Sequence, residues 1–398
     1  MSSLRSLDNM ELGLLHLMNL ASISHLNITT GEGSNEGEVQ REAFWHRVAA
    51  TIASEHAQLR VSVETKETTR PPNSTEMVRA CAVTNKRWVM GQFVALPSDF
   101  DYGSLVTVHR ASSRDAWQQV TRDAIALDAA KGDCYDYLVV GGTMPGWRLH
   151  VVLYSEDGQK EGKKKKKNRK KKGSSLKGST AQTAGTTSVT LVITYSHAIG
   201  DGTSTRVLSY TAGSSVAAVL QGKVGVPTLV TAGQLPVSRH ATLLGGENAT
   251  PSRSGRLLNK ALSALMPKVI AFFLAEPIPF KASVMGPFST VMGWSSMDAR
   301  GALTLREALK AGKAQGVRFN SILLATCAFI AEYLGRASAN VKIKKHKTSI
   351  AVAMRRDERV KAGHPHPTET DLCCAISVAE LEAKISNDGT SFWQVAQQ

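Results

Sequence analysis

Cysteine is scarce in this chain, and its spacing points to no chemistry. The 398 residues include five cysteines, at positions 81, 134, 327, 373 and 374. The number is odd, and no Cys-x-x-Cys pair or Cys/His spacing indicates zinc. A disulfide framework and a structural zinc site are therefore excluded, and a reducing compartment is favoured. The sequons at Asn27, Asn73 and Asn248 are then incidental.

Long apolar runs are also missing. The segment Leu12–Ala21 is interrupted by His16 and Asn19, and acidic residues precede it where a signal peptide has cations. The segment Val269–Leu274 is far too short to span a bilayer. We therefore expect a cytoplasmic protein without a transmembrane segment.

Positive charge is concentrated in one place. The formal charge is +15, but the run Lys163–Lys172 carries nine cations, and without it the charge is +6. The surrounding residues 155–187 are of low complexity and cannot supply a core, so we expect a disordered basic insertion. A solvated loop, a nuclear address and a contact with an anionic membrane or RNA all remain open for it.

The most informative stretch is Ser188–Val207. Its first part, Val189–Tyr195, is rich in β-branched residues and predicts a mostly buried strand. A turn with two glycines follows, and Thr203 or Ser204 is expected to cap a helix that runs to Leu220. A histidine delivered into such a turn is held rigidly while its imidazole stays accessible, which suits a general base. His197 is therefore the candidate catalytic residue.

The spacing of His197, Asp201 and Gly202, His-x-x-x-Asp-Gly, resembles the signature of the chloramphenicol-acetyltransferase-like superfamily. That superfamily includes condensation domains of peptide synthetases, BAHD acyltransferases, wax ester synthases and alcohol acetyltransferases. Further segments resemble it in the right order: Leu59-Arg60, Pro145–Arg148, Asn320–Leu334, Ser349–Arg356 and Ser391–Ala396. The chain departs from the pattern at Arg318, where a threonine is usual, and at Ala353, where an aspartate is usual.

The resemblance implies an α/β fold with two chloramphenicol-acetyltransferase-like halves. Each half has a mixed sheet packed with helices, and an active-site tunnel lies between the halves. We expect the N-terminal half over residues 1–221, a crossover over 222–285, and the C-terminal half over 286–398. Family members continue with further strands and a helix, so the C-terminal half is expected to be incomplete.

The resemblance also implies a reaction, acyl transfer from acyl-CoA to an alcohol or an amine. His197 would act as the base, with no covalent enzyme intermediate, no metal and no permanently bound cofactor. Asp201 would pair with Arg355 and brace the turn, and Gly202 would allow the tight turn and leave room for substrate. From the residues alone, Asp201 orienting His197 as in a catalytic triad is a further possibility. A monomer is expected.

Other interpretations compete with these. His197 on its own also fits a buried, hydrogen-bonded structural histidine. His56 tempts a catalytic interpretation, but a histidine near the carbonyls of a helix end is favoured. A different class of function is a non-catalytic binding or scaffold protein of the same fold, tethered to an anionic surface through Lys163–Lys172. Ser196, where many condensation domains have a second histidine, makes a carrier-protein-dependent enzyme less favoured.

Overall fold

The computed structural model describes residues 3–8, 11–12, 19–29, 36–68, 80–84, 87–112, 114–130, 144–155, 186–238, 299–339, 345–353, 368–384 and 391–397. The chain forms two compact units. The first unit comprises residues 1–252, 287–290 and 353–375, and the second comprises 253–286, 291–352 and 376–398. Residues 353–375 thus belong to the first unit although they come late in the chain. The expected domain boundaries stay a prediction.

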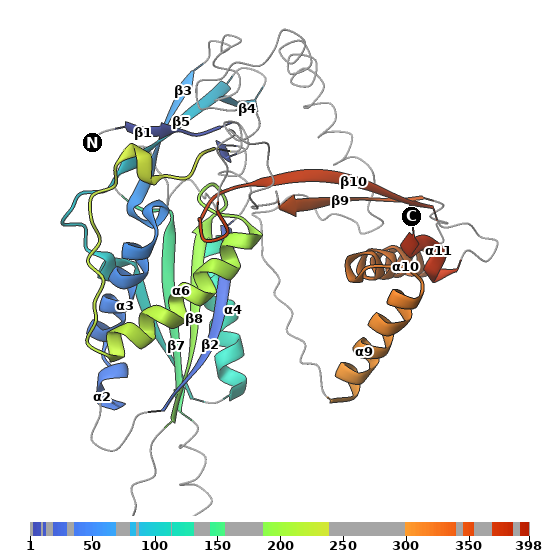
Figure 1. Cartoon of the computed structure of the whole chain (residues 1–398), viewed down its shortest axis with the longest axis horizontal. Coiled ribbons are helices and arrows are strands. Elements are labelled where there is room, and N and C mark those ends of the chain that lie inside the picture. Colours follow the sequence, from blue (N-terminus) through green and yellow to red (C-terminus); the bar gives the residue numbers. More distant parts are fainter. Residues whose placement is uncertain are drawn as a thin grey trace, which may run out of the picture. The chain divides into compact units, whose positions relative to one another are not determined.

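The first unit is built on a mixed sheet with the strand order β2-β8-β7-β6 (Figure 1). Strand β8 (Thr186–Ser196) is antiparallel to both β2 (Asn19–Thr29) and β7 (Trp147–Ser155), while β6 (Val106–Ala111) is parallel to β7. Residues 189–196 of β8 are all buried, as expected for a β-branched strand with neighbours on both sides. The predicted buried strand is confirmed, and it pairs with the strand that begins at Trp147.

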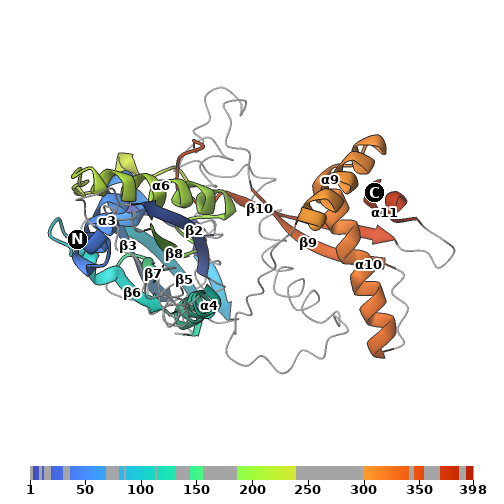
Figure 2. The same cartoon turned by 90° about the horizontal axis from the view of Figure 1, so that it is seen from below.

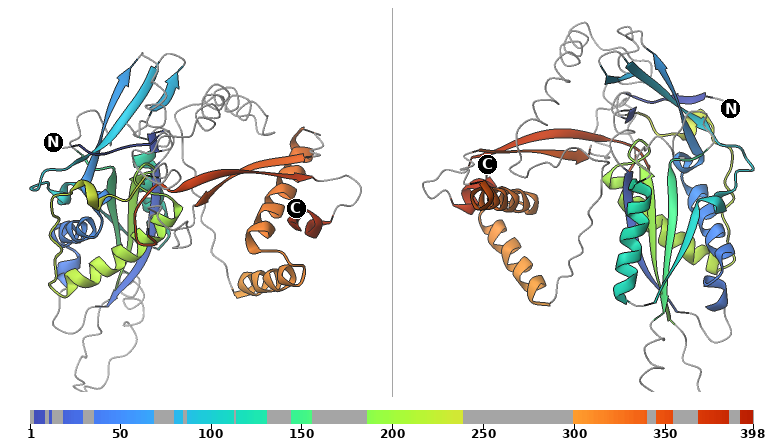
Figure 3. Two further views of the ribbon diagram at one scale, coloured as in Figure 1. Left: turned by 45° about the horizontal axis from the view of Figure 1, so that its top comes forward. Right: turned by 180° about the vertical axis from the view of Figure 1, so that it is seen from behind.

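Helices cover both faces of this sheet (Figures 2 and 3). Helices α3 (Glu42–Glu55) and α6 (Gly202–Leu220) lie on one face, and α4 (Arg114–Ala130) lies on the other. Alternate residues of β7, from Trp147 to Leu153, join the hydrophobic core with residues of α3 and α6. Trp147 also donates from its indole Nε1 to the carbonyl of Leu59 at 2.9 Å, which links β7 to the short 3-10 helix that follows α3.

A second sheet in the first unit holds β1 (Ser3–Ser6), β5 (Arg87–Ala95), β3 (Val61–Thr68) and β4 (Ala80–Thr84), with β5 paired to the other three. A short helix, α2 (Glu36–Val39), precedes α3. Short 3-10 helices occupy Ala57–Arg60 (η1), Tyr102–Leu105 (η3) and Ala232–Gln234 (η4).

The second unit contains α9 (Ala299–Ala314), α10 (Phe319–Ala339), α11 (Phe392–Gln397), and the paired strands β9 (Lys345–Ala353) and β10 (Ile376–Lys384). Its core joins Ile322, Ala325 and Ala328 of α10 with Val395 and Ala396 of α11. Helix α10 contains the segment Asn320–Leu334, and α11 overlaps Ser391–Ala396; both segments carry the family resemblance. No helix within the described part of the chain is long and apolar enough to cross a membrane.

The expected α/β class with mixed sheets is therefore confirmed. Some predictions concern segments outside the described residues. They are the basic insertion around Lys163–Lys172 and the part of the expected crossover from residue 239 to 285. The partner proposed for Asp201, Arg355, also lies outside the described residues.

Candidate functional site

The candidate site is the turn that joins β8 to α6. The amide of Ser196 donates to the carbonyl of Gly146 at 2.8 Å, so β8 stays paired up to its last residue. The amide of Ile199 then donates to the carbonyl of Ser196 at 3.1 Å, and the amide of Ala198 donates to the Ser196 hydroxyl at 3.2 Å. These bonds close a tight turn around His197 using local chemistry that serine readily supplies.

Asp201 ends the turn by capping α6. Its Oδ1 accepts from the amides of Thr203 at 2.9 Å and Ser204 at 3.0 Å. The sequence prediction that Thr203 or Ser204 is the cap was wrong, because the helix starts at Gly202 and the residue before it has the extended backbone of an N-cap. Asp201 is completely buried. Its hydrogen bonds join the end of the turn to the first turn of α6, while the expected pairing with Arg355 stays a prediction.

Tyr195 supports the turn from the core side. Its hydroxyl donates to the carbonyl of Asp201 at 2.9 Å and lies 2.6 Å from the hydroxyl of Thr205 in the first turn of α6. The ring is buried, with 2% of its surface exposed. Sequence reasoning treated Tyr195 only as a strand residue, because the aromatic pattern gives no sign of where the hydroxyl points.

The two glycines of the turn have different roles. A Cβ on Gly200 would lie 2.8 Å from Cε2 of Tyr195 and 2.9 Å from Cβ of Ser204, so the tight turn needs a glycine at this position. A Cβ on Gly202 would meet nothing within 4 Å. The expectation that Gly202 permits the tight turn is therefore corrected in favour of Gly200. Space beside Gly202 remains compatible with its other expected role, leaving room for substrate.

His197 is the first residue of the turn, and 8% of its surface is exposed. Its Nδ1 is buried and has no hydrogen-bond partner among the described residues. The interpretation of His197 as a buried, hydrogen-bonded structural histidine is not supported at this nitrogen. The Asp201 carboxylate bonds to backbone amides and to the Ser204 hydroxyl. Since Nδ1 of His197 has no partner among the described residues, a triad-like bond from this nitrogen to Asp201 is not observed.

A segment from late in the chain contacts the same helix start. The hydroxyl of Ser204 lies 3.2 Å from the carbonyl of Cys373 and accepts from its amide at 3.3 Å, and Oδ2 of Asp201 accepts from the amide of Ala375 at 3.1 Å. Burial raises the pKa of the Cys374 thiol well above its usual range, and the nearby carboxylates of Glu11, Asp8 and Asp201 act in the same direction. Nothing in the local sequence around Cys373 predicts this contact.

Glu11 is a buried acid that sequence analysis did not single out. Its carboxylate forms a bidentate ion pair with Arg5, in which Nη2 lies 2.7 Å from Oε1 and Nη1 lies 3.1 Å from Oε2. It also accepts from the amide of Asp8 at 2.8 Å. Burial nevertheless raises the pKa of Glu11 to about 7. The reciprocal bond from the amide of Glu11 to Asp8 at 2.8 Å makes a capping-box arrangement, so we assign Glu11 a structural role.

His56 is placed where α3 ends and is not part of the turn. Its Nε2 lies 2.8 Å from the hydroxyl of Thr211 in α6. Burial lowers the pKa of His56 to about 4, with a smaller opposing effect from Asp371, so the ring is neutral at pH 7. The favoured structural interpretation is supported, although the described partner is a hydroxyl and not a helix carbonyl.

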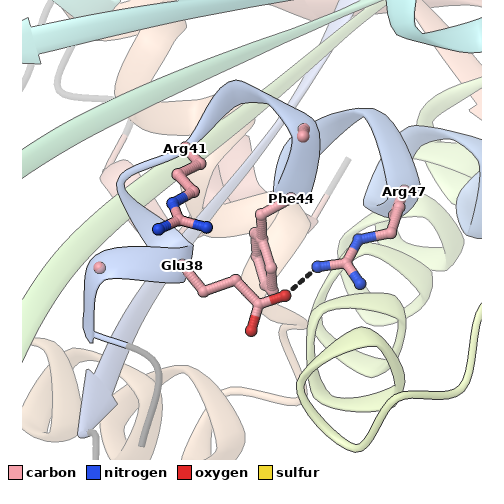
Figure 4. Close-up of a pocket in the computed structure, with 6 residues that line it drawn as sticks. Glu38, Arg41, Phe44 and Arg47 are labelled. Carbon is pink, nitrogen blue, oxygen red and sulfur yellow. Dashed lines mark hydrogen bonds and ion pairs between the residues drawn. The ribbon is translucent and has the colours of Figure 1, made fainter.

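Among the described residues of the first unit, two surface pockets can be identified, and His197 lines neither of them. One, of about 500 Å³, lies between α2 and the start of α3 and is lined by Gly37, Glu38, Arg41, Ala43, Phe44 and Arg47 (Figure 4). Glu38 forms an ion pair with Arg47, whose guanidinium lies 5.9 Å from the ring centre of Phe44. The other, of about 530 Å³, is lined by Ser6, Glu64, Thr65, Lys66, Met90, Gly91 and Gln92.

The described side chains do not suggest metal chemistry. They contain no group of three or more His, Cys, Asp or Glu residues arranged to hold an ion. Cys327, Cys373 and Cys374 are free thiols.

Comparison with known proteins gives likenesses of fold only. No protein-family model matches the sequence, and no curated protein is significantly similar to it. A solved first condensation domain of the calcium-dependent antibiotic synthetase aligns with 99% of this chain and 72% of its own, at 11% identity and a TM-score of 0.49. Polyketide synthase associated protein 5 from Mycobacterium tuberculosis aligns with 100% of this chain and 71% of its own length, at 14% identity and a TM-score of 0.45.

A structure reported for condensation domain-mediated chain release from the enacyloxin polyketide synthase aligns with all of this chain at 13% identity and a TM-score of 0.42. This chain spans 61% of that chain's length. The neighbours thus include the condensation domains that the motif at His197 resembles. At TM-scores below 0.5 and identities of 11–14%, they carry no argument about substrate or mechanism.

The two turn glycines yield a matched prediction. Gly200→Ala forces a Cβ against Tyr195 and Ser204, so we expect a loss of about 1–3 kcal/mol in the free energy of unfolding, measured with urea. Gly202→Ala meets open space, and we expect its stability to stay the same or to rise by up to about 1 kcal/mol. Equal losses in both variants would contradict this assignment.

His56 yields a pH prediction. Because its folded-state pKa, about 4, lies below the ordinary value of 6.5, the unfolded chain binds a proton first as the pH falls. His56 therefore stabilises the fold above pH 6.5, and this contribution, at most about 3 kcal/mol, is lost as the pH drops from 6.5 to 4.

We expect His56→Gln to flatten the stability profile in this window, measured by urea unfolding at each pH. The raised pKa of Glu11 has the opposite effect, because its contribution to stability is lost as the pH rises from 4.5 to 7. Both proteins contain Glu11, so this contribution cancels when their stabilities are subtracted. Parallel profiles for the two proteins would show that His56 is not the titrating group.

Proposed function

We propose that the protein is an acyltransferase that moves an acyl group from acyl-CoA to an alcohol or an amine, with His197 as the general base. The observation that carries the proposal is the state of the imidazole. The turn around it is braced by hydrogen bonds on every side, yet its buried Nδ1 has no partner among the described residues. Most buried polar atoms in native proteins are hydrogen-bonded, and a catalytic role is one explanation for an atom that is not.

The proposed mechanism uses an imidazole that accepts a proton while it is held in a fixed turn. The acceptor's O–H or N–H gives its proton to Nε2 of His197, since Nδ1 is the buried nitrogen. The acceptor oxygen or nitrogen then bonds to the thioester carbonyl carbon, and the carbon–sulfur bond breaks as the tetrahedral intermediate collapses. His197 returns the proton to the departing thiolate, so the reaction needs no covalent enzyme intermediate.

The surrounding residues serve positioning in this proposal. Asp201 fixes the end of the turn, and Tyr195 holds the carbonyl of Asp201 in place. The amide of Gly202 lies at the start of α6, where the helix dipole favours a developing negative charge on the substrate oxygen. Arg355, proposed as the partner of Asp201, and the tunnel between two halves remain parts of the proposal.

The test is thiol release from acyl-CoAs offered with pooled alcohols and amines. We expect His197→Ala to lower turnover by about 10²–10⁴-fold, the usual contribution of a general base, with an unchanged unfolding midpoint. His25→Gln is the matched control, because His25 lies on β2 beside β8 and bonds to Thr190 at 2.9 Å, away from the turn. Turnover retained in His197→Ala would refute the proposal.

The alternative, a binding protein tethered through Lys163–Lys172, is favoured by one observation. The insertion leaves the sheet between Ser155 of β7 and Thr186 of β8, at the opposite end of β8 from the turn. The 11 residues of β8 separate the two by about 35 Å. A basic contact there would be independent of His197.

We therefore expect replacement of Lys163–Lys172 by a Gly/Ser linker to abolish salt-sensitive binding to vesicles of anionic phospholipid while the unfolding midpoint stays the same. Cosedimentation at low and high salt measures this. Undiminished binding by the replaced protein, or binding to neutral vesicles as well, would exclude the tether.

A further inference from the structure

Residues Leu372–Ala375 are held against the start of α6 by the same two side chains that shape the turn. The hydroxyl of Ser204 contacts both the carbonyl and the amide of Cys373, at 3.2 and 3.3 Å. Oδ2 of Asp201 accepts from the amide of Ala375 at 3.1 Å. Ser204 and Asp201 are completely buried, and Leu372, Cys373, Cys374 and Ala375 are exposed by 1–6%.

The two oxygens of the Asp201 carboxylate bond to different segments of the chain. Its Oδ1 accepts from the first amides of α6 and lies 3.2 Å from the hydroxyl of Ser204, while its Oδ2 binds the late segment. Two contacts with the same carboxylate tie the orientation of the cap to the position of residues 372–375. His197 is four residues before this carboxylate in a closed turn, so the cap and the imidazole are positioned together.

The segment is also the covalent link to another part of the molecule. Residues 353–375 belong to the first unit, and the next residue, Ile376, begins β10 of the second unit. The stretch that bonds to Asp201 and Ser204 is therefore the last part of the first unit before the chain leaves it.

We propose that Leu372–Ala375 is a strap that fixes the position of the His197 turn, and that Ser204 is the positioning residue through which it acts. The catalytic consequence rests on the proposed function; docking of the strap on α6 does not. Loss of the Ser204 hydroxyl removes one partner from each backbone group of Cys373 and one from Asp201. The strap then opens more often, and the turn loses its fixed position.

The strap contains its own reporters of docking. Cys373 and Cys374 are buried, and burial raises the pKa of Cys374, so both thiols are protected while the strap is docked. Cys327, on α10 in the second unit, is exposed and serves as an internal reference. Thiol labelling therefore measures docking without reference to any reaction.

The experiment compares Ser204→Ala with Ser214→Ala. Ser214 is an exposed serine of the same helix whose hydroxyl donates to the carbonyl of Thr211 at 3.0 Å. Each protein is labelled with a maleimide, and the rates at Cys373, Cys374 and Cys327 are read from peptide masses. We expect labelling at Cys373 and Cys374 to be about tenfold faster in Ser204→Ala, with Cys327 and the Ser214→Ala protein unchanged.

The second readout separates positioning from general stability. We expect kcat of acyl-CoA thiol release to fall roughly tenfold or more in Ser204→Ala with little change in KM, because misplacement of a base affects the chemical step. If Ser204→Ala does not fold, Ala375→Pro removes the amide that donates to Asp201 without altering α6, and the same two changes are expected.

The outcomes are distinguishable. Faster labelling without turnover in any of the proteins supports the strap and counts against the proposed function. Faster labelling with kcat unchanged overturns the positioning role of Ser204. Labelling at the wild-type rate in the folded variants overturns the strap itself.

Discussion

The candidate site depends on one buried carboxylate. A carboxyl group taken out of water is tolerated only when its oxygens are hydrogen-bonded, and those of Asp201 accept from three backbone amides, of Thr203, Ser204 and Ala375. Two of these amides start α6, and the third comes from a segment more than 170 residues later. Satisfying this single group therefore fixes the end of β8, the first turn of α6 and the segment at Ala375 in one arrangement.

The rest of the turn is built so that the imidazole has little freedom. Tyr195 donates to the carbonyl of Asp201 from the core side. Position 200, between Tyr195 and Ser204, has room only for a glycine. The hydrogen bonds inside the turn use the backbone and the Ser196 hydroxyl, so none of them occupies the ring of His197. A rigid frame whose own hydrogen bonds do not involve the imidazole suits base catalysis, since a base that must reorganise loses its advantage in the transition state.

The two chemically distinctive features of the first unit lie at opposite ends of one strand. The turn with His197 follows the last residue of β8, and the basic insertion precedes the first. Because β8 is paired on both sides along its whole length, changes at the insertion are separated from the turn by a rigid element. An enzymatic role for the turn and a tethering role for the lysine run are thus compatible in one molecule.

Sequence alone indicated most of the elements and singled out His197 as the candidate base. The β-branched run of β8, the glycine-containing turn and the apolar spacing of α3, α4, α9 and α10 are local signals, because neighbouring residues dictate whether a strand, a turn or a helix forms. The cap residue was misassigned because Asp201, Thr203 and Ser204 all favour helix starts, and only the backbone shows which one precedes the helix. Tertiary structure alone decided that Gly200 needs to be a glycine, that Tyr195 supports the turn, and that Ser204 meets Cys373. Those contacts join residues that the chain brings together only when the core packs, so no pattern in the sequence around any one of them carries the information.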